Sequence, residues 1–307
     1  MIWASLLAPA AHGRGISLFV QERLSKQCEP DYNPGVQMSG YLSPQEREQL
    51  ARQVVADMAA PAVVPPQEAA PLSEVQRFAG TFFAPSKTFT DLRRNASWWA
   101  PFLIIAVVSL SFVYVVDQKV GFRKVAENLI QLQPKQADRI DSMPADQRQK
   151  VMQQQATITK IISYTVPIIA LGIYAVFAGI LFATLKFGAS ADLKYKTLFA
   201  LVVYTRLPQL LATLLAMLSL LAGVSGDGFN IQNPVATNPG YFIGPDGSAV
   251  LRALLTPLDI FNIWTLVLTA IGITCISKVK RGTAFAVVFG WFAIVVVVRV
   301  AMAAAFG

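Results

Sequence analysis

The sequence contains little of the chemistry on which enzymes depend. It has one histidine, His12, and two cysteines, Cys28 and Cys275, in 307 residues. A single histidine excludes a histidine-based metal cluster and leaves no Ser–His or Cys–His pair. No glycine-rich phosphate loop precedes a helix. We therefore expect a protein that is not an enzyme, with no cofactor, no metal site and no disulfide framework.

Charged residues are also scarce. They make up 14% of the chain, against 54% apolar residues, and a soluble domain of this length would carry more charge. The formal net charge is +8, but the lysines and arginines gather at the ends of apolar runs. This pattern indicates a membrane lipid environment and argues against a nucleic-acid partner.

Long apolar runs dominate the second part of the chain. A helix needs about 20 apolar residues to cross the hydrocarbon core of a bilayer. Five runs reach or approach that length: 98–116, 161–185, 198–224, 260–276 and 283–306. The sequence therefore predicts an all-α, polytopic integral membrane protein with five transmembrane helices.

The basic residues also predict the orientation. They precede the first run and fill the connections between runs two and three and between runs four and five: Lys87, Arg93, Arg94, Lys186, Lys194, Lys196, Lys278, Lys280 and Arg281. The connection 225–259, on the opposite side, has only Arg252. Because cytoplasmic loops are enriched in lysine and arginine, we predict a cytoplasmic N-terminus and an outside C-terminus. The expected location is the cell membrane, with a bacterial inner membrane favoured.

Residues 1–77 are predicted to form a mobile cytoplasmic tail. Ser43 and Glu46 have the spacing of a capping box, so a short helix is expected over 43–60. Two interpretations of it stay open: a solvated helix, or a docking helix for a cytoplasmic protein partner. A proline-rich linker follows, and residues 78–307 are predicted to form the membrane domain.

The third apolar run contains a charge and a helix breaker. Arg206 lies roughly 12–14 Å into this run, where contact with lipid would cost about 2.5 kcal/mol or more. Pro208 removes a backbone hydrogen bond and frees a carbonyl at Tyr204. One interpretation is structural: Arg206 bonds to the freed carbonyls, and Tyr204 fills the core. The other is a binding site for an anionic lipid headgroup or a partner.

Further candidate residues lie within or beside the later runs. Asp259 can cap the helix of the fourth run, or pair with Arg252 across the outer surface. Trp264 and Arg299 are interpreted as interfacial anchors. Two pairs of small residues suit close helix contact, within the chain or between copies, so a homo-oligomer is also considered. These pairs are Ala175–Gly179 and Ala286–Gly290.

The order of these features resembles the Yip domain, the Ypt-interacting membrane protein family, and in particular its bacterial members. "FFAPSKTFTDL" precedes the first run, and the basic "KFGASADLKYKTLFAL" leads into "VVYTRLPQLL". The stretch "LTPLDIFNIWTLVLTAIGI" follows, with Asp259, Trp264 and Gly272 in it. The resemblance covers roughly residues 78–306. It implies a bundle of five membrane helices with a cytoplasmic N-terminus.

The predicted function is a non-enzymatic membrane adaptor or scaffold. It would bind a cytoplasmic protein partner or organise membrane lipid. Eukaryotic members of the resembling family bind prenylated Rab-type GTPases, but family resemblance alone does not transfer that partner to this chain. The alternative is a small transporter or permease component for an anionic solute, because a broken helix beside a charge is a transporter device. No carboxylate lies inside the apolar runs, which counts against a proton relay.

Overall fold

A computed structural model describes residues 43–46, 48–49, 52–53, 70–223, 225–244 and 246–306. The chain divides into two compact units, Met1–Glu68 and Ala69–Gly307.

The described residues of the first unit carry a helix start. Residues 44–46, 48–49 and 52–53 are helical. The backbone N–H of Ser43 donates to Glu46 Oε2 over 2.7 Å, and that of Glu46 donates to Ser43 Oγ over 3.3 Å. This reciprocal pair is a capping box. Residues 47, 50–51 and 54–60 of the predicted helix, and most of the proline-rich linker, lie outside the described residues.

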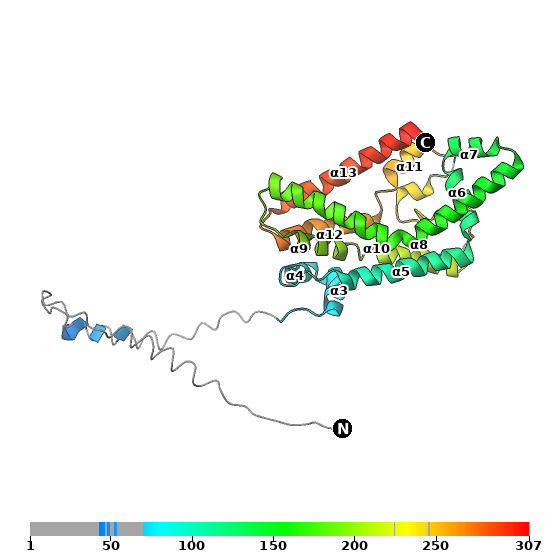
Figure 1. The fold of residues 1–307 in the computed structure, drawn as a ribbon. Coiled ribbons are helices and arrows are strands. Elements are labelled where there is room, and N and C mark those ends of the chain that lie inside the picture. The colour runs from blue at the N-terminus through cyan, green and yellow to red at the C-terminus, as the bar shows by residue number, and fades with distance from the viewer. Residues whose placement is uncertain are drawn as a thin grey trace, which may run out of the picture. The chain divides into compact units, whose positions relative to one another are not determined.

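The second unit is built of helices, and no strand occurs in the part of it that the structure describes (Figure 1). The α-helices are α3 (Glu74–Phe83), α4 (Pro85–Asp91), α5 (Trp99–Lys119), α6 (Phe122–Gln131), α7 (Pro134–Asp141), α8 (Ala145–Ala183), α9 (Tyr195–Thr205), α10 (Gln209–Leu221), α11 (Ala249–Leu255), α12 (Ile260–Ile276) and α13 (Arg281–Phe306). A π-helical turn, η1 (Thr184–Gly188), continues α8, and a 3₁₀ turn, η2 (Pro239–Phe242), precedes α11. The predicted all-α class is confirmed.

Four helical segments are long and apolar enough to cross a membrane: α5, α8 with η1, α9 with α10, and α13. Helix α12 has 17 residues, which at 1.5 Å per residue is about 26 Å, less than the hydrocarbon core of about 30 Å. It meets the length and composition criteria only together with α11, from which it is bent by 44°. The described chain thus has four or five candidate spans, as a multi-pass membrane protein requires. The predicted fourth run, 260–276, is the second half of a bent pair.

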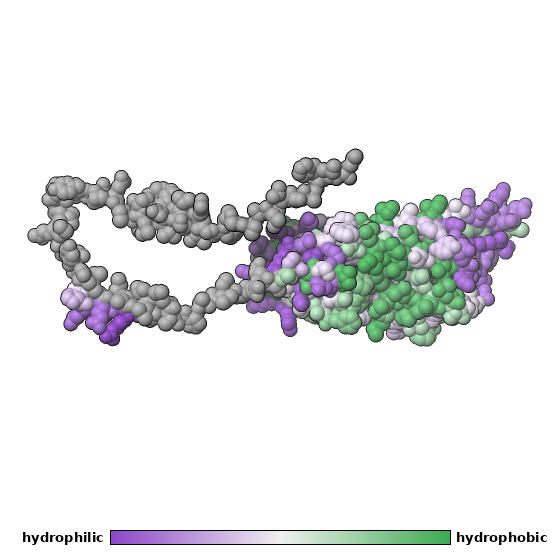
Figure 2. Space-filling view, turned by 90° about the horizontal axis from the view of Figure 1, so that it is seen from below, coloured by the Kyte–Doolittle hydropathy of each residue, from purple (hydrophilic) through white to green (hydrophobic). Residues whose placement is uncertain are grey.

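Exposed apolar side chains form a belt around the second unit. Figure 2 shows a green apolar zone between two purple, hydrophilic ends. The belt includes Leu103 and Val107 of α5, Ile161 and Ile168 of α8, Leu214 and Leu218 of α10, Val250 and Leu254 of α11, and Val295 and Val298 of α13. A soluble monomer rarely exposes so large an apolar surface to water. Hydrocarbon is the solvent that suits this belt.

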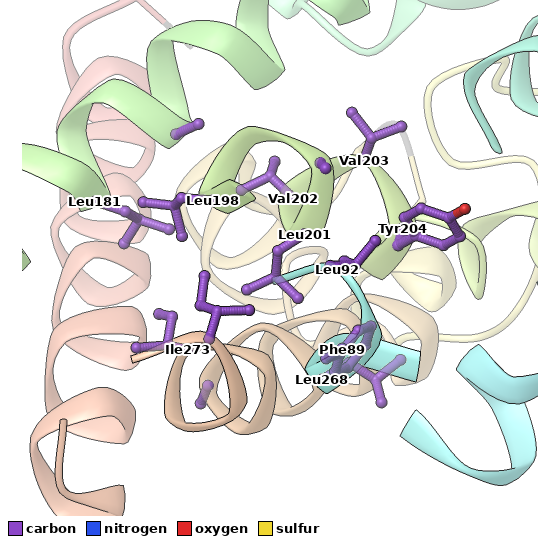
Figure 3. Packing of buried hydrophobic residues seen from close by; sticks show 14 of the residues in the cluster. Phe89, Leu92, Leu181, Leu198, Leu201, Val202, Val203, Tyr204, Leu268 and Ile273 are labelled. Atoms are coloured by element: carbon purple, nitrogen blue, oxygen red, sulfur yellow. The ribbon is translucent and has the colours of Figure 1, made fainter. Parts of the chain in front are cut away.

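Helices α9 and α12 form the centre of the bundle. Eight of the 11 residues of α9 are buried, and Figure 3 shows Leu201 of α9 pointing toward Ile273 of α12. The two helices approach closely at Gly272, where an added Cβ would overlap with Leu201 Cδ1. Thr269 Oγ1 of α12 lies 3.0 Å from Thr205 Oγ1 of α9. A glycine and a threonine pair therefore allow two apolar helices to pack closely, as in other membrane bundles.

Helices α3 and α4 form a short hairpin that is held together by ion pairs and joined to this core by a hydrogen bond from Tyr204. Arg77 is 1% exposed, and its Nη2 lies 2.7 Å from Asp91 Oδ2. Arg77 Nη1 also lies 3.4 Å from Glu74 Oε1, and the Tyr204 hydroxyl donates to Glu74 Oε2 over 2.7 Å. Burial by itself would lower the pKa of Arg77, but the hydrogen bond and charge of Asp91 outweigh it and raise that pKa. Arg77 therefore stays protonated and ties the hairpin together.

Candidate functional site

Two helix breaks lie beside one cavity. Residues 206–208 separate α9 from α10, and residues 256–259 separate α11 from α12. The cavity has a volume of about 470 Å³. From the two breaks and the turns that follow them, it is lined by Arg206, Gln209, Thr256, Pro257, Asp259 and Asn262. The fold thus brings the predicted candidates Arg206 and Asp259 to the same cavity.

At the first break, the backbone N–H and C=O groups form hydrogen bonds with one another. The N–H of Leu207 donates to the carbonyl of Tyr204 over 3.1 Å, and the N–H of Gln209 donates to that of Arg206 over 3.0 Å. Pro208 occupies the N-cap position of α10. The expectation that the Arg206 side chain bonds to carbonyls freed by Pro208 is wrong, because a tight turn of the backbone takes up the Tyr204 carbonyl. Pro208 instead divides the third run into two helices.

The guanidinium of Arg206 lies against aromatic rings. Its Cζ is 5.3 Å from the ring centre of Tyr174 and 5.5 Å from that of Phe177, both on α8. Such cation–π contacts contribute about 0.5–2 kcal/mol each. Arg206 Nε is enclosed and has no hydrogen-bond partner among the described residues, and no carboxylate there forms an ion pair with this arginine. Arg206 therefore keeps unused hydrogen-bonding capacity beside the cavity.

Asp259 is already engaged by its surroundings. Its Oδ1 accepts from the backbone N–H groups of Phe261, over 2.9 Å, and Asn262, over 3.1 Å. Its Oδ2 accepts from the hydroxyl of Thr237. The predicted cap of the helix that begins at Ile260 is confirmed, since these bonds satisfy its first free N–H groups. This carboxylate closes the second break and ties the loop before α11 to it.

Helices α8 and α13 form the sides of the cavity. Trp291 Nε1 of α13 donates to Thr184 Oγ1, just after α8, over 3.0 Å, which joins the two helices at one end. Farther along they are separated by the cavity, which Ile173 and Phe177 of α8 and Val295 and Arg299 of α13 line. Among the described residues there is no group of three His, Cys, Asp or Glu side chains that could hold a metal ion. The polar side chains that line this cavity are two arginines, several amides, the hydroxyls of Thr237 and Thr256, and the carboxylate of Asp259.

Tyr204 and Trp264 belong to a different region. Tyr204 is fully buried and bonded to Glu74 of α3. Trp264 packs edge-on against Phe82 of α3, with ring centres 5.9 Å apart. Both residues therefore hold the α3–α4 hairpin against the core. The structure brings Arg206, Pro208 and Asp259 to the helix breaks and leaves Tyr204 and Trp264 at the hairpin.

Sequence reasoning missed several residues beside the cavity. Tyr174 and Phe177 are three residues apart in the second run, so they share a helix face, as Arg206 requires. Gln209 and Asn262 each follow a candidate residue by three positions. This spacing predicts which residues share a helix face with one another. It does not predict which face of which helix turns toward Arg206. Thr237 lies in a turn-rich loop, and nothing in the sequence indicates its bond to Asp259.

A second candidate site lies where α8 ends and α9 and α13 begin (Figure 1). We call it the basic surface, and it consists of nine exposed residues: Lys87, Arg93, Arg94, Lys186, Lys194, Lys196, Lys278, Lys280 and Arg281. Within 87–94, 186–196 and 278–281 the one exposed carboxylate is Asp192. Phe83 and Phe187 are 89% and 81% exposed in the adjoining segments. Positive charge and accessible aromatic rings therefore occur together.

Comparison with known protein families shows that residues 79–302 match the Yip1 domain. No curated protein and no solved structure matches the chain. The matched range covers more than half of the chain and includes both helix breaks, the cavity and the motifs on which the resemblance was based. The predicted multi-pass membrane architecture agrees with this assignment. The chain therefore belongs to the Yip1 domain family.

Proposed function

We propose that this Yip1 domain protein is a non-enzymatic membrane adaptor or scaffold. It binds a cytoplasmic protein partner through the basic surface and contacts anionic lipid headgroups with the same residues. The observation that carries the proposal is the charge of that surface, which contains nine exposed basic residues and one exposed carboxylate. Such a surface attracts acidic partners and accelerates their association. Phe83 and Phe187 supply exposed aromatic anchors beside it.

The proposed setting is the cell membrane, in particular a bacterial inner membrane, with the basic surface on the cytoplasmic side. Assembly of copies is part of the proposal. Gly179 and Gly290 have open space over their Cα atoms within the chain, so their helices can approach a neighbouring copy there.

The test is co-purification of the tagged full-length chain from its native membrane in mild detergent, with mass spectrometry of the bound proteins. A triple variant, Lys194→Gln, Lys196→Gln and Lys280→Gln, removes three exposed charges from the basic surface. A matched control, Lys119→Gln, Lys135→Gln and Lys150→Gln, removes three exposed charges elsewhere. We expect a stoichiometric partner that the first variant loses and the control keeps. A partner retained by both variants, or no partner at all, would contradict the proposal.

The second candidate function is transport of an anionic solute. The observation that favours it is the pair of helix breaks around one cavity beside Arg206. Discontinuous helices that meet at a polar site are a device of secondary transporters. Proteoliposomes containing the wild type and Arg206→Gln would be compared for uptake of a labelled anionic solute. Uptake that depends on Arg206 would replace the scaffold proposal by transport.

A further inference from the structure

We propose that the cavity between the helix breaks binds the phosphate group of an anionic phospholipid, with Arg206 as its principal ligand. The inference is independent of the protein partner proposed for the basic surface. It is carried by the cavity, by an arginine with unused hydrogen-bonding capacity, and by walls that continue into the apolar belt.

Arg206 lacks the hydrogen-bonded partner that a buried charge usually has. A buried charge requires compensation, and a buried donor without a partner is rare in folded proteins. The rings of Tyr174 and Phe177 compensate part of the charge, but they accept no hydrogen bond from the guanidinium. Its Nε is enclosed, and its more accessible Nη1 and Nη2 have no hydrogen-bond partner among the described residues either. A phosphate supplies the missing negative charge and several acceptor oxygens, in a geometry that the guanidinium fork matches.

The side chains that line the cavity carry more positive than negative charge. Arg206 and Arg299 both line it, and Asp259 is the one carboxylate among its lining residues. Both oxygens of Asp259 are already engaged by donors on α12 and on Thr237. Among the described residues no ion pair joins this carboxylate to Arg206, so the arginine lacks a direct counterion. The side-chain amide of Gln209 adds a further donor at the same wall, so the cavity favours an anion.

The cavity is open to the apolar belt, from which a phospholipid can enter it. Ile173 and Val295 line the cavity from α8 and α13, yet they are 58% and 51% exposed on the apolar belt. The cavity therefore continues into the surface that faces hydrocarbon. A phospholipid can place its phosphate at Arg206 while its acyl chains remain against the belt. The volume of about 470 Å³ lies in the range of about 300–1,000 Å³ found for small-molecule sites.

The experiment measures lipid retention and thermal stability of the purified full-length protein. Native mass spectrometry counts bound phosphatidylglycerol after delipidation and re-addition, with phosphatidylcholine as the neutral competitor. We expect the wild type to retain phosphatidylglycerol in preference to phosphatidylcholine and to unfold at a higher temperature with it. Arg206→Gln is expected to weaken retention by at least tenfold. Arg123→Gln, which changes an exposed arginine away from the cavity, leaves retention unchanged.

A second variant tests the site without removing the charge. Val295→Trp places a large ring at the cavity wall, whereas Val297→Trp places the same ring on the exposed surface of α13 outside the cavity lining. We expect only Val295→Trp to lose the lipid. Equal retention by Val295→Trp and Val297→Trp would overturn the proposal, as would equal retention of phosphatidylcholine. Stabilisation of the wild type by sn-glycerol 3-phosphate alone, with no lipid retained, would also overturn it and assign the cavity to a free solute.

Discussion

Arg77 and Arg206 are both largely enclosed by protein, but their surroundings differ. Arg77 is paired with Asp91 and Glu74, so its charge is neutralised within the fold. Arg206 has two aromatic faces and no carboxylate partner among the described residues. A paired charge fixes structure, whereas one with free donor capacity can bind a ligand. At the scale of single residues, this contrast assigns Arg77 to stability, and it supports the lipid site proposed at Arg206.

Loss of Arg77 is expected to be severe. Arg77→Ala leaves Asp91, which is 8% exposed, as a buried charge without its partner. Breaking a buried ion pair costs about 3–5 kcal/mol. Arg123→Ala is the control, because its pair with Glu127 is exposed, and such pairs contribute about 0–1 kcal/mol. Thermal unfolding in detergent should show a large decrease in melting temperature for Arg77→Ala and almost none for Arg123→Ala.

The double variant Arg77→Met with Asp91→Leu separates charge from packing. It removes both charges together, so it should recover most of the stability that the single change loses. A double variant as unstable as Arg77→Ala would mean that the shape of the arginine, and not its pairing, holds the hairpin.

Hydropathy predicted Arg206 as a candidate, because a charge inside an apolar run stands out in the sequence. Arg77 could not be predicted in the same way. It lies in an amphipathic segment before the first span, where basic residues are common, and its partner Asp91 is 14 residues away. A tertiary ion pair leaves no periodic signal. The same limit applies to Thr237, which bonds to Asp259 from a loop.

At the scale of elements, the packing of α9 on α12 depends on one glycine. Gly272→Ala is expected to destabilise the bundle, because the new Cβ overlaps with the buried side chain of Leu201. Overpacking of this kind costs about 1–3 kcal/mol. Gly172→Ala on α8 is the matched control, since nothing lies within 4 Å of a Cβ there. Melting temperatures in detergent should fall for the first variant and not for the second.

Relief of the overlap provides the check on this explanation. Adding Leu201→Ala to Gly272→Ala removes the clash, so the second change should cost less in that background than in the wild type. Purely additive losses would show that Gly272 acts through the backbone of α12 and not through contact with Leu201.

The elements show why the helices were easier to predict than their breaks. Long apolar runs identify α5, α8, α9 together with α10, and α13, because the hydrocarbon core sets their length. Helix α11 has seven residues and follows a turn-rich loop, so its sequence was included in an outer loop. Its bent pairing with α12 depends on contacts that only the folded chain supplies. The cavity lies where the two helix breaks come together in the folded chain. Hydropathy does not predict that the two breaks are neighbours.

At the scale of the whole molecule, the bend between α11 and α12 decides the topology. If the pair crosses the membrane as one broken span, the chain has five spans and its termini lie on opposite sides. If the pair re-enters on the side from which it came, there are four spans and both termini share a side. The basic connections on either side of the third and fourth runs predict the first arrangement, because lysines and arginines favour the cytoplasmic side.

Reporter fusions to the C-terminus and single cysteines together test this prediction. In a variant with Cys28→Ser and Cys275→Ser, Ser190→Cys lies between η1 and α9 near the basic surface, and Ser225→Cys lies in the loop after α10. We expect an impermeant maleimide to label Ser225→Cys and not Ser190→Cys in intact cells, and a C-terminal alkaline phosphatase to be active. A fluorescent C-terminal green fluorescent protein with inactive phosphatase would indicate four spans. Helices α11 and α12 would then form a re-entrant pair. The cavity beside them would open to the side of the membrane from which that pair enters.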